Sequence, residues 1–309
     1  MKISKILFKH SIRRTVFGIL SVALLGGCIV SPKQHLKIES ASFDEGSIVA
    51  GKSGQTVSFE SMMADLKSVQ VIYAGEKHTS PEHHEIQLRI IKEIYKDFPD
   101  MMVGMEIFAR PYQPVLDEWS KGKLDESTFL KRVHWYANWK YDFALYRKIL
   151  AFIKDKNIRL VGLNVPFHIP SKVAVGGIET LLKDDQKYLP EKIDTSITAH
   201  REYLKGVFEH HHVKGRQDFE NFYMAQCVWE DAMAETIAEN LKQSKMVVLV
   251  GNGHIYRKFG IPQRAFNRTG RSFRTLHPVI VGGNAQLIDA DYLWVTPKSK
   301  RKSFHRFKQ

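Results

Sequence analysis

The chain has 309 residues, with 46 Lys and Arg against 33 Asp and Glu, and a formal net charge of +13. Its length and its 43% apolar content allow one large domain with a sizeable core, or one domain with a helical lobe. Two cysteines exclude a disulfide-rich scaffold. The positive charge comes without any RNA- or DNA-binding motif, so nucleic acid is not an expected partner.

Residues 1–27 predict a bacterial lipoprotein signal peptide. A basic start precedes the apolar run 15–25, which is too short for a confident membrane span. Residues 25–28 (LGGC) resemble a lipobox, in which Cys28 is acylated and anchors the protein to a membrane without spanning it. The alternative is an ordinary signal peptide beside a chance cysteine. Ile29 in place of the usual aspartate retention signal favours the outer membrane of the cell envelope.

Two further segments lie outside the predicted fold. Residues 28–57 are polar and patternless, which predicts a tether between membrane and domain. Residues 298–309 are basic and contain no acid. They predict a solvated tail, with attraction to anionic lipid headgroups as the alternative. The folded domain is therefore expected over residues 58–297.

The domain begins with a βαβ unit. A strand over about 68–74 precedes a helix that Ser80 can cap, with Pro81 at its first position. That helix runs to about residue 98, and a second strand follows over 101–108. The two strands should pair in parallel, with a right-handed crossover.

The rest of the chain alternates long helical stretches with short strands. Further strands are expected over 158–165, 246–250, 273–281 and 292–295. The stretches at about 111–157 and 167–225 are longer than simple crossovers need. We therefore predict an α/β fold in which a mostly parallel central sheet is flanked by helices, with a smaller helical lobe formed by these insertions. Cys227 falls in a helical pattern and is expected to be a small buried hydrophobe.

Two strands end in the same signature, a glycine followed three residues later by a histidine, at 75–78 and 251–254. In open α/β sheets ligands bind at the carboxyl ends of the strands, so Glu76, His78, Glu106 and His254 are expected to converge there. Two imidazoles and a carboxylate suit a divalent metal such as zinc, manganese or iron(II), with His78, Glu106 and His254 as its ligands. The remaining carboxylate could then activate a water. The alternative is that these side chains bond to backbone ends and stiffen the turns.

Other polar and aromatic residues lie near the same edge. His84 continues the inward stripe of the first helix. Arg110 could grip a carboxylate or phosphate in bidentate fashion, or form a surface ion pair. The histidine run 210–212 is expected to be solvated. The aromatic stretch 135–146 either packs in the core or lines a slot for a flat apolar cofactor.

These segments resemble, in the same order over about residues 60–265, the ChaN family of haem-binding lipoproteins. The segments that carry the resemblance are 75–78, 83–87, 104–113, 163–166, 225–226, 229–234 and 251–254. The resemblance implies an α/β domain with a helical lobe and haem held between two subunits. The wider superfamily includes the Tiki metalloproteases and erythromycin esterases, where the same histidines and glutamate mark the active site.

Two functions follow from the resemblance. The first is haem binding in iron uptake, by a ligand-linked homodimer with an outer-membrane haem receptor as partner. The implied iron ligand is a tyrosine, and no cysteine motif for covalent attachment is present. His84 or Arg110 would neutralise the propionates. The candidate ligands are Tyr136, Tyr141, Tyr146 and Tyr203.

The second function is a metal-dependent hydrolase built on Glu76, His78, Glu106 and His254. A third reading is an envelope scaffold with an inactive pocket. Haem binding should depend on the helical insertions and a tyrosine, whereas hydrolysis should depend on the four strand-end residues.

Overall fold

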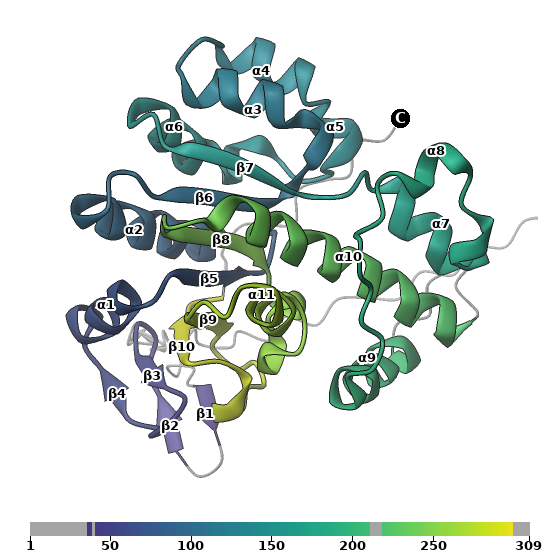
Figure 1. The fold of residues 1–309 in the computed structure, drawn as a ribbon. Coiled ribbons are helices and arrows are strands. Elements are labelled where there is room, and N and C mark those ends of the chain that lie inside the picture. Colours follow the sequence, from purple (N-terminus) through teal and green to yellow (C-terminus); the bar gives the residue numbers. More distant parts are fainter. Residues whose placement is uncertain (1–35, 39–40, 211–217, 299–309) are drawn as a thin grey trace, which may run out of the picture. The chain divides into compact units, whose positions relative to one another are not determined.

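The computed structural model describes residues 36–38, 41–210 and 218–298 (Figure 1). Its centre is an eight-stranded sheet with the order β4-β3-β10-β9-β5-β8-β6-β7. The strands are β3 (Ile48–Ala50), β4 (Thr56–Val57), β5 (Val71–Glu76), β6 (Met102–Ala109), β7 (Arg159–Asn164), β8 (Met246–Gly251), β9 (Phe273–Ile280) and β10 (Tyr292–Thr296). The six strands from β10 to β7 pair in parallel, and β3 and β4 add an antiparallel edge. The predicted mostly parallel α/β sheet is thus confirmed.

Helices connect the strands and cover the sheet. The α-helices are α1 (Phe59–Ser68), α2 (Pro81–Asp97), α3 (Gln113–Ser120), α4 (Glu126–Arg132), α5 (Trp135–Asn138), α6 (Arg147–Asp155), α7 (His168–Gly176), α8 (Lys183–Gln186), α9 (Thr198–His210), α10 (Phe219–Leu241) and α11 (Ile261–Thr269). Short 3-10 turns are η1 (Arg110–Tyr112), η2 (Phe143–Leu145), η3 (Ile178–Thr180), η4 (Asn252–His254), η5 (Tyr256–Lys258) and η6 (Leu287–Asp289). Among the described helices none is long and apolar enough to cross a membrane.

The two faces of the sheet carry different helices, because alternate side chains of a strand point to opposite faces. On β5, Ile72 packs in one core with α1, α2, α3 and α6, whereas Tyr73 packs in another with α10 and α11. The same alternation holds on β8 for Val247 and Val248. The sheet is therefore buried on both sides, and its ligand-accessible edge is the one where the strands end.

The helix after β5 begins as predicted. The side chain of Ser80 accepts the backbone N–H of His83, and Pro81 occupies the first turn, where its missing N–H costs nothing. His84 and Gln87 lie on the buried side of α2, directly behind the end of β5. The cap therefore fixes which face of α2 turns toward the site.

The prediction of a patternless tether over 28–57 is wrong for its described part. Two strands, β1 (Leu36–Ile38) and β2 (Ala41–Phe43), form a small antiparallel pair. β3 then joins the main sheet by pairing with β10. The apolar residues here are sparse, which hid the pattern, but Ile48 and Val49 are both buried. Cys28 and the tail 299–309 lie outside the described residues.

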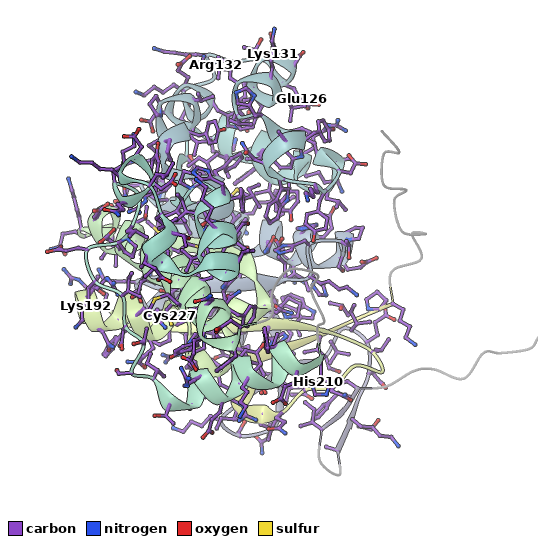
Figure 2. All side chains as sticks on the ribbon, turned by 90° about the vertical axis from the view of Figure 1, so that its right-hand side faces the viewer. Glu126, Lys131, Arg132, Lys192, His210 and Cys227 are labelled. Carbon is purple, nitrogen blue, oxygen red and sulfur yellow. The ribbon has the colours of Figure 1, made fainter. Side chains whose placement is uncertain are left out.

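The predicted helical lobe is also partly wrong. The aromatic residues of the first insertion, such as Trp119, Phe129 and Trp135, share one core with strands β5 and β6. Residues 111–157 are thus a cover of the sheet. The second insertion does form a lobe: α7 and α9 pack on α10, and α8 is joined to α7 through Asp185 (Figure 1). Cys227, in that region of α10, is fully buried as expected (Figure 2).

Candidate functional site

Three neighbouring strands bring the predicted residues together. Glu76, the last residue of β5, is paired in register with Gly251, the last residue of β8. Glu106 of β6 accepts the backbone N–H of Gly251 at 2.7 Å. A side chain at Gly251 would lie only 3.1 Å from Cε1 of His78, so His78 and Glu106 meet over this glycine. The convergence expected at the carboxyl edge is present in the structure.

Glu76 is a fully buried carboxylate with several donors. It pairs with Nδ1 of His78 at 2.7 Å and accepts hydrogen bonds from Tyr146 at 2.5 Å and Gln87 at 2.8 Å. Burial alone would raise the pKa of Glu76, but its hydrogen bonds with His78 and His84 hold that pKa well below the usual range. Glu76 therefore stays ionised and orients the His78 ring.

His254 lies between two buried carboxylates. Its Nε2 is 3.6 Å from Glu106 and its Nδ1 is 3.1 Å from Glu230. Burial would lower the pKa of His254, but Glu106 and Glu230 together raise it to about 10. His254 is therefore a protonated imidazolium at neutral pH, fixed at both ring nitrogens.

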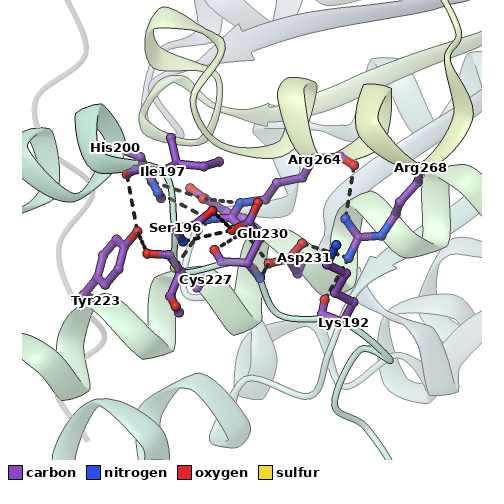
Figure 3. A network of polar contacts seen from close by, with 12 residues as sticks. Lys192, Ser196, Ile197, His200, Tyr223, Cys227, Glu230, Asp231, Arg264 and Arg268 are labelled. Atoms are coloured by element: carbon purple, nitrogen blue, oxygen red, sulfur yellow. Dashed lines mark hydrogen bonds and ion pairs between the residues drawn. The ribbon is translucent and has the colours of Figure 1, made fainter.

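Glu230 extends this contact into a buried network that the sequence analysis missed. It lies on α10 within 3.2 Å of His200 on α9 and 3.4 Å of Arg264 on α11 (Figure 3). Arg264 also pairs with Asp231, and both side chains are buried. The available signal was two adjacent acids, Glu230 and Asp231, between the apolar residues Val228–Trp229 and Ala232–Ala234.

A pocket of about 580 Å³ opens over these residues. His78 and His254 lie at its base, and α9 and α10 supply the apolar side chains Leu204, Val207 and Phe222. Two of the four predicted tyrosines, Tyr141 and Tyr203, also line it. The remaining lining residues are Glu76, Lys77, Thr79, Gln226, Gly251, Asn252 and Gly253.

The two pocket tyrosines have different surroundings. Tyr141 packs against His78, with ring centroids 5.2 Å apart. Tyr203 stacks on Tyr256 at 4.2 Å, and its hydroxyl faces Gly253. Burial raises the pKa of Tyr203 to about 12. The Tyr203 hydroxyl has no hydrogen-bond partner within the part of the chain that the structure describes, so it is available to a ligand.

The other predicted cofactor residues lie elsewhere or are already paired. Tyr146 is fully buried and donates to Glu76, while Tyr136 is 58% exposed and outside the pocket. His84 is buried behind Glu76. Arg110 donates to Glu235 at 2.8 Å and to the Tyr188 carbonyl at 2.7 Å, which makes it the ion pair considered as the alternative. None of these four presents a free group to the pocket.

The predicted metal set is not assembled. Over residues 36–38, 41–210 and 218–298, no group of three or more His, Cys, Asp or Glu side chains is arranged to hold a metal ion. The cause is visible at His254, whose two ring nitrogens both face carboxylates, and at His78, whose Nδ1 is held by Glu76.

Comparison with known proteins supports this picture of the fold. Residues 62–265 match the family model described as haem-binding uptake, Tiki superfamily, ChaN. The chain belongs to the ChaN family. The match begins in α1 and ends in α11, so it includes every residue of the candidate site.

Solved structures with the same fold include a ChaN protein. The structure described as cofacial heme binding to ChaN of Campylobacter jejuni has a TM-score of 0.65 and 18% identity, over 80% of this chain and 95% of that one. A mutant erythromycin esterase, EreC, in its open conformation scores 0.45 at 11% identity, over 76% of this chain and 77% of its own. The type III effector HopBA1 scores 0.44 at 11% identity, over 77% and 92%. A search of curated proteins found no match.

Proposed function

We propose that this ChaN-family protein binds haem non-covalently in the pocket over β5 and β8. The observation that carries the proposal is the pairing of a free phenol, Tyr203, with the apolar side chains Leu204, Val207 and Phe222 in one pocket of a haem-binding family member. Ferric haem is held by an axial ligand, such as tyrosinate, together with apolar contacts to the macrocycle. The pocket supplies both.

Tyr203 is the axial ligand in this proposal. Its ring is held flat against Tyr256, and its hydroxyl is directed toward Gly253, which has no side chain to obstruct an approaching ligand. Tyr141 is the second choice, because its ring is packed against both His78 and Trp139. Because the pKa of free Tyr203 is about 12, binding as tyrosinate releases a proton.

The charge around the pocket also suits haem. Lys77 lies in the pocket lining and supplies a cation for a propionate. This role replaces the one expected for Arg110, whose guanidinium is occupied by Glu235.

The proposal extends to a dimer. α9 and α10 supply Leu204, Val207 and Phe222 to the pocket, and one face of the macrocycle would lie against these side chains. We propose that a second subunit covers the other face, so that haem binding and dimerisation are linked. The anchor is the acylated Cys28, which places the protein on the outer membrane as a component of haem uptake, beside a haem receptor.

A haem titration of residues 29–309 tests the binding proposal. We expect a saturable Soret change with the spectrum of tyrosinate-ligated ferric haem, and a monomer-to-dimer shift in sedimentation. Tyr203→Phe should abolish the tyrosinate spectrum, while Tyr136→Phe, an exposed tyrosine outside the pocket, should leave it unchanged. Loss of the spectrum in Tyr141→Phe alone would move the ligand to Tyr141. No saturable binding would overturn the proposal.

The anchor has its own test. Cells fed a labelled fatty acid should label the wild type and not Cys28→Ala, and only the wild type should fractionate with the outer membrane. Labelling of Cys28→Ala would show that the lipobox interpretation is wrong, with no bearing on haem binding.

A further inference from the structure

We infer that Glu230 is a positioning residue that fixes both sides of the haem pocket, holding His254 on the sheet and helix α9 with Tyr203 on the lobe. The inference rests on the proposed function, because it assigns Tyr203 to the ligand. Glu230 itself does not line the pocket and would not touch the haem.

The contacts of Glu230 span three elements. One carboxylate oxygen, Oε1, is 3.1 Å from Nδ1 of His254, at the end of β8. The other, Oε2, is 3.2 Å from Nε2 of His200 on α9 (Figure 3). Glu230 is only 1% exposed, so water does not replace these contacts. A single carboxylate therefore connects the sheet edge with the lobe.

The contact with His200 connects Glu230 to Tyr203, the proposed iron ligand, through helix α9. His200 and Tyr203 are three residues apart on α9, so their side chains lie on neighbouring positions of one helix face. Tyr203 packs on Tyr256, which follows His254 by two residues. Glu230 thus contacts the supports of Tyr203 from both directions: His200 within the same helix, and the segment that carries Tyr256.

The charge of Glu230 is maintained by its surroundings. Burial alone would raise its pKa, but His200, His254 and Arg264 hold the pKa of Glu230 well below the usual range. Arg264 is fully buried beside it and also binds Asp231. The carboxylate is therefore ionised in the folded protein, and its hydrogen bond with His254 is charge-assisted.

Asp231 provides a matched control. It is the next residue of α10, equally buried, and shares Arg264 with Glu230. Its other partners are Arg268 at 2.8 Å and the backbone N–H of Asp194, away from the pocket. Replacing either acid disturbs the same buried arginine, but only Glu230 contacts His254 and His200.

The test compares Glu230→Gln with Asp231→Asn in the full mature chain. We expect Glu230→Gln to weaken haem binding by about tenfold and to shift the tyrosinate charge-transfer band, because Tyr203 is no longer held in place. Asp231→Asn should lower the unfolding midpoint without moving that band, and Glu230→Asp should restore part of the affinity. If the two variants bind haem with equal affinity and neither shifts the charge-transfer band, Glu230 only stabilises the fold, and the inference is overturned.

A measurement without haem separates this inference from the proposed function. Hydrogen exchange in α9 of the ligand-free protein should be faster in Glu230→Gln than in Asp231→Asn, at matched distance from each unfolding midpoint. If the wild type binds no haem while α9 still loosens selectively, the proposed function fails and the positioning role stands. If the exchange rates of α9 are equal in the two variants, the positioning role fails whether or not haem binds.

Discussion

Glu106 and Gly251 are joined by a 2.7 Å hydrogen bond from the Gly251 backbone N–H to the Glu106 carboxylate, at the ends of adjacent strands. The bond occupies one oxygen of Glu106 and leaves the other, Oε1, facing His254. Burial would raise the pKa of Glu106, but His254 and His78 lower it. The carboxylate is thus an ionised connector between the Gly251 backbone and the His254 imidazole.

Adding a methyl group at Gly251 should damage the site. In Gly251→Ala the new Cβ would lie 3.1 Å from Cε1 and 3.2 Å from Nε2 of His78. The His78 ring must then shift by a few tenths of an ångström against its bond to Glu76. We expect a loss of about 1–3 kcal/mol in the free energy of unfolding together with weaker haem binding. Thermal unfolding and haem titration measure both.

Gly206→Ala is the matched control for that substitution. A Cβ at Gly206 on α9 meets nothing within 4 Å. A glycine inside a helix costs roughly 0.5–1 kcal/mol relative to alanine, so Gly206→Ala should stabilise the protein by a comparable amount. Equal destabilisation by the two substitutions would contradict the close approach at Gly251.

Tyr146 should contribute to stability through its hydroxyl. It donates a 2.5 Å hydrogen bond to the ionised, buried Glu76. Tyr146→Phe keeps the ring and removes this bond, which should cost about 1.5–3 kcal/mol of unfolding free energy, the range for bonds to charged groups. Urea unfolding gives the value. Tyr136→Phe should cost nothing measurable, and a loss in that exposed variant would invalidate the comparison.

The stability of the protein should fall as the pH rises above 6.5. The pKa of His254 is about 10 in the folded protein, raised from an ordinary value of 6.5. A raised histidine pKa stabilises fully below pH 6.5, and this contribution is lost as the pH approaches 10. The slope from one proton is at most about 1.4 kcal/mol per pH unit.

Unfolding midpoints measured from pH 6.5 to 9.5 test this dependence. His78, whose pKa is also raised, adds to the same decline. His83 and His277, whose pKa values burial lowers to about 3 and about 4, are neutral in the folded protein throughout the range. They contribute in the opposite sense only near pH 6.5, where the unfolded chain still loses their protons. His254→Gln should therefore flatten the slope, and an unchanged slope in that variant would contradict the assignment.

Arg264 should be far more important for folding than a surface arginine. It is fully buried between Glu230 and Asp231, so Arg264→Met removes the cation that these two buried carboxylates share. Asp231 then keeps Arg268, and Glu230 keeps its two histidines. Removing one partner of a buried pair costs about 3–5 kcal/mol. Arg132, labelled in Figure 2, forms an exposed ion pair with Glu118. Arg132→Ala breaks that pair and should lower the free energy of unfolding by less than about 1 kcal/mol. Denaturant titrations of both variants measure the two losses of unfolding free energy, and equal losses would contradict the prediction.

The sheet could be predicted because its determinants are local. A few neighbouring residues are enough to predict a strand from the apolar run 246–250, or a helix start from Ser80 and Pro81. The structure has β8 and α2 at these positions. The convergence of Glu76, Glu106 and His254 followed from one rule about parallel sheets. Strand positions were right to within a few residues at each end.

The parts that could not be predicted depend on contacts distant in sequence. Ile48 and Val49 become a strand only because β10, more than 200 residues later, offers an edge to pair with. The role of Glu230 depends on His200 and Arg264 arriving from two other helices. Which tyrosine is free was equally hidden, since only the fold shows that Tyr146 is bonded to Glu76 while Tyr203 is not.

The strand order has a consequence for how the protein is made. β8 lies between β5 and β6 in the sheet, although it follows both by more than 130 residues in the chain. Until β8 has been synthesised, the facing edges of β5 and β6 have no partner and are open to pairing with other chains. Gly251 is the last residue of that late strand, and His254 follows three residues later. A chain stopped before residue 246 therefore lacks the strand that pairs with both edges, and it also lacks the pocket residues Gly251 and His254.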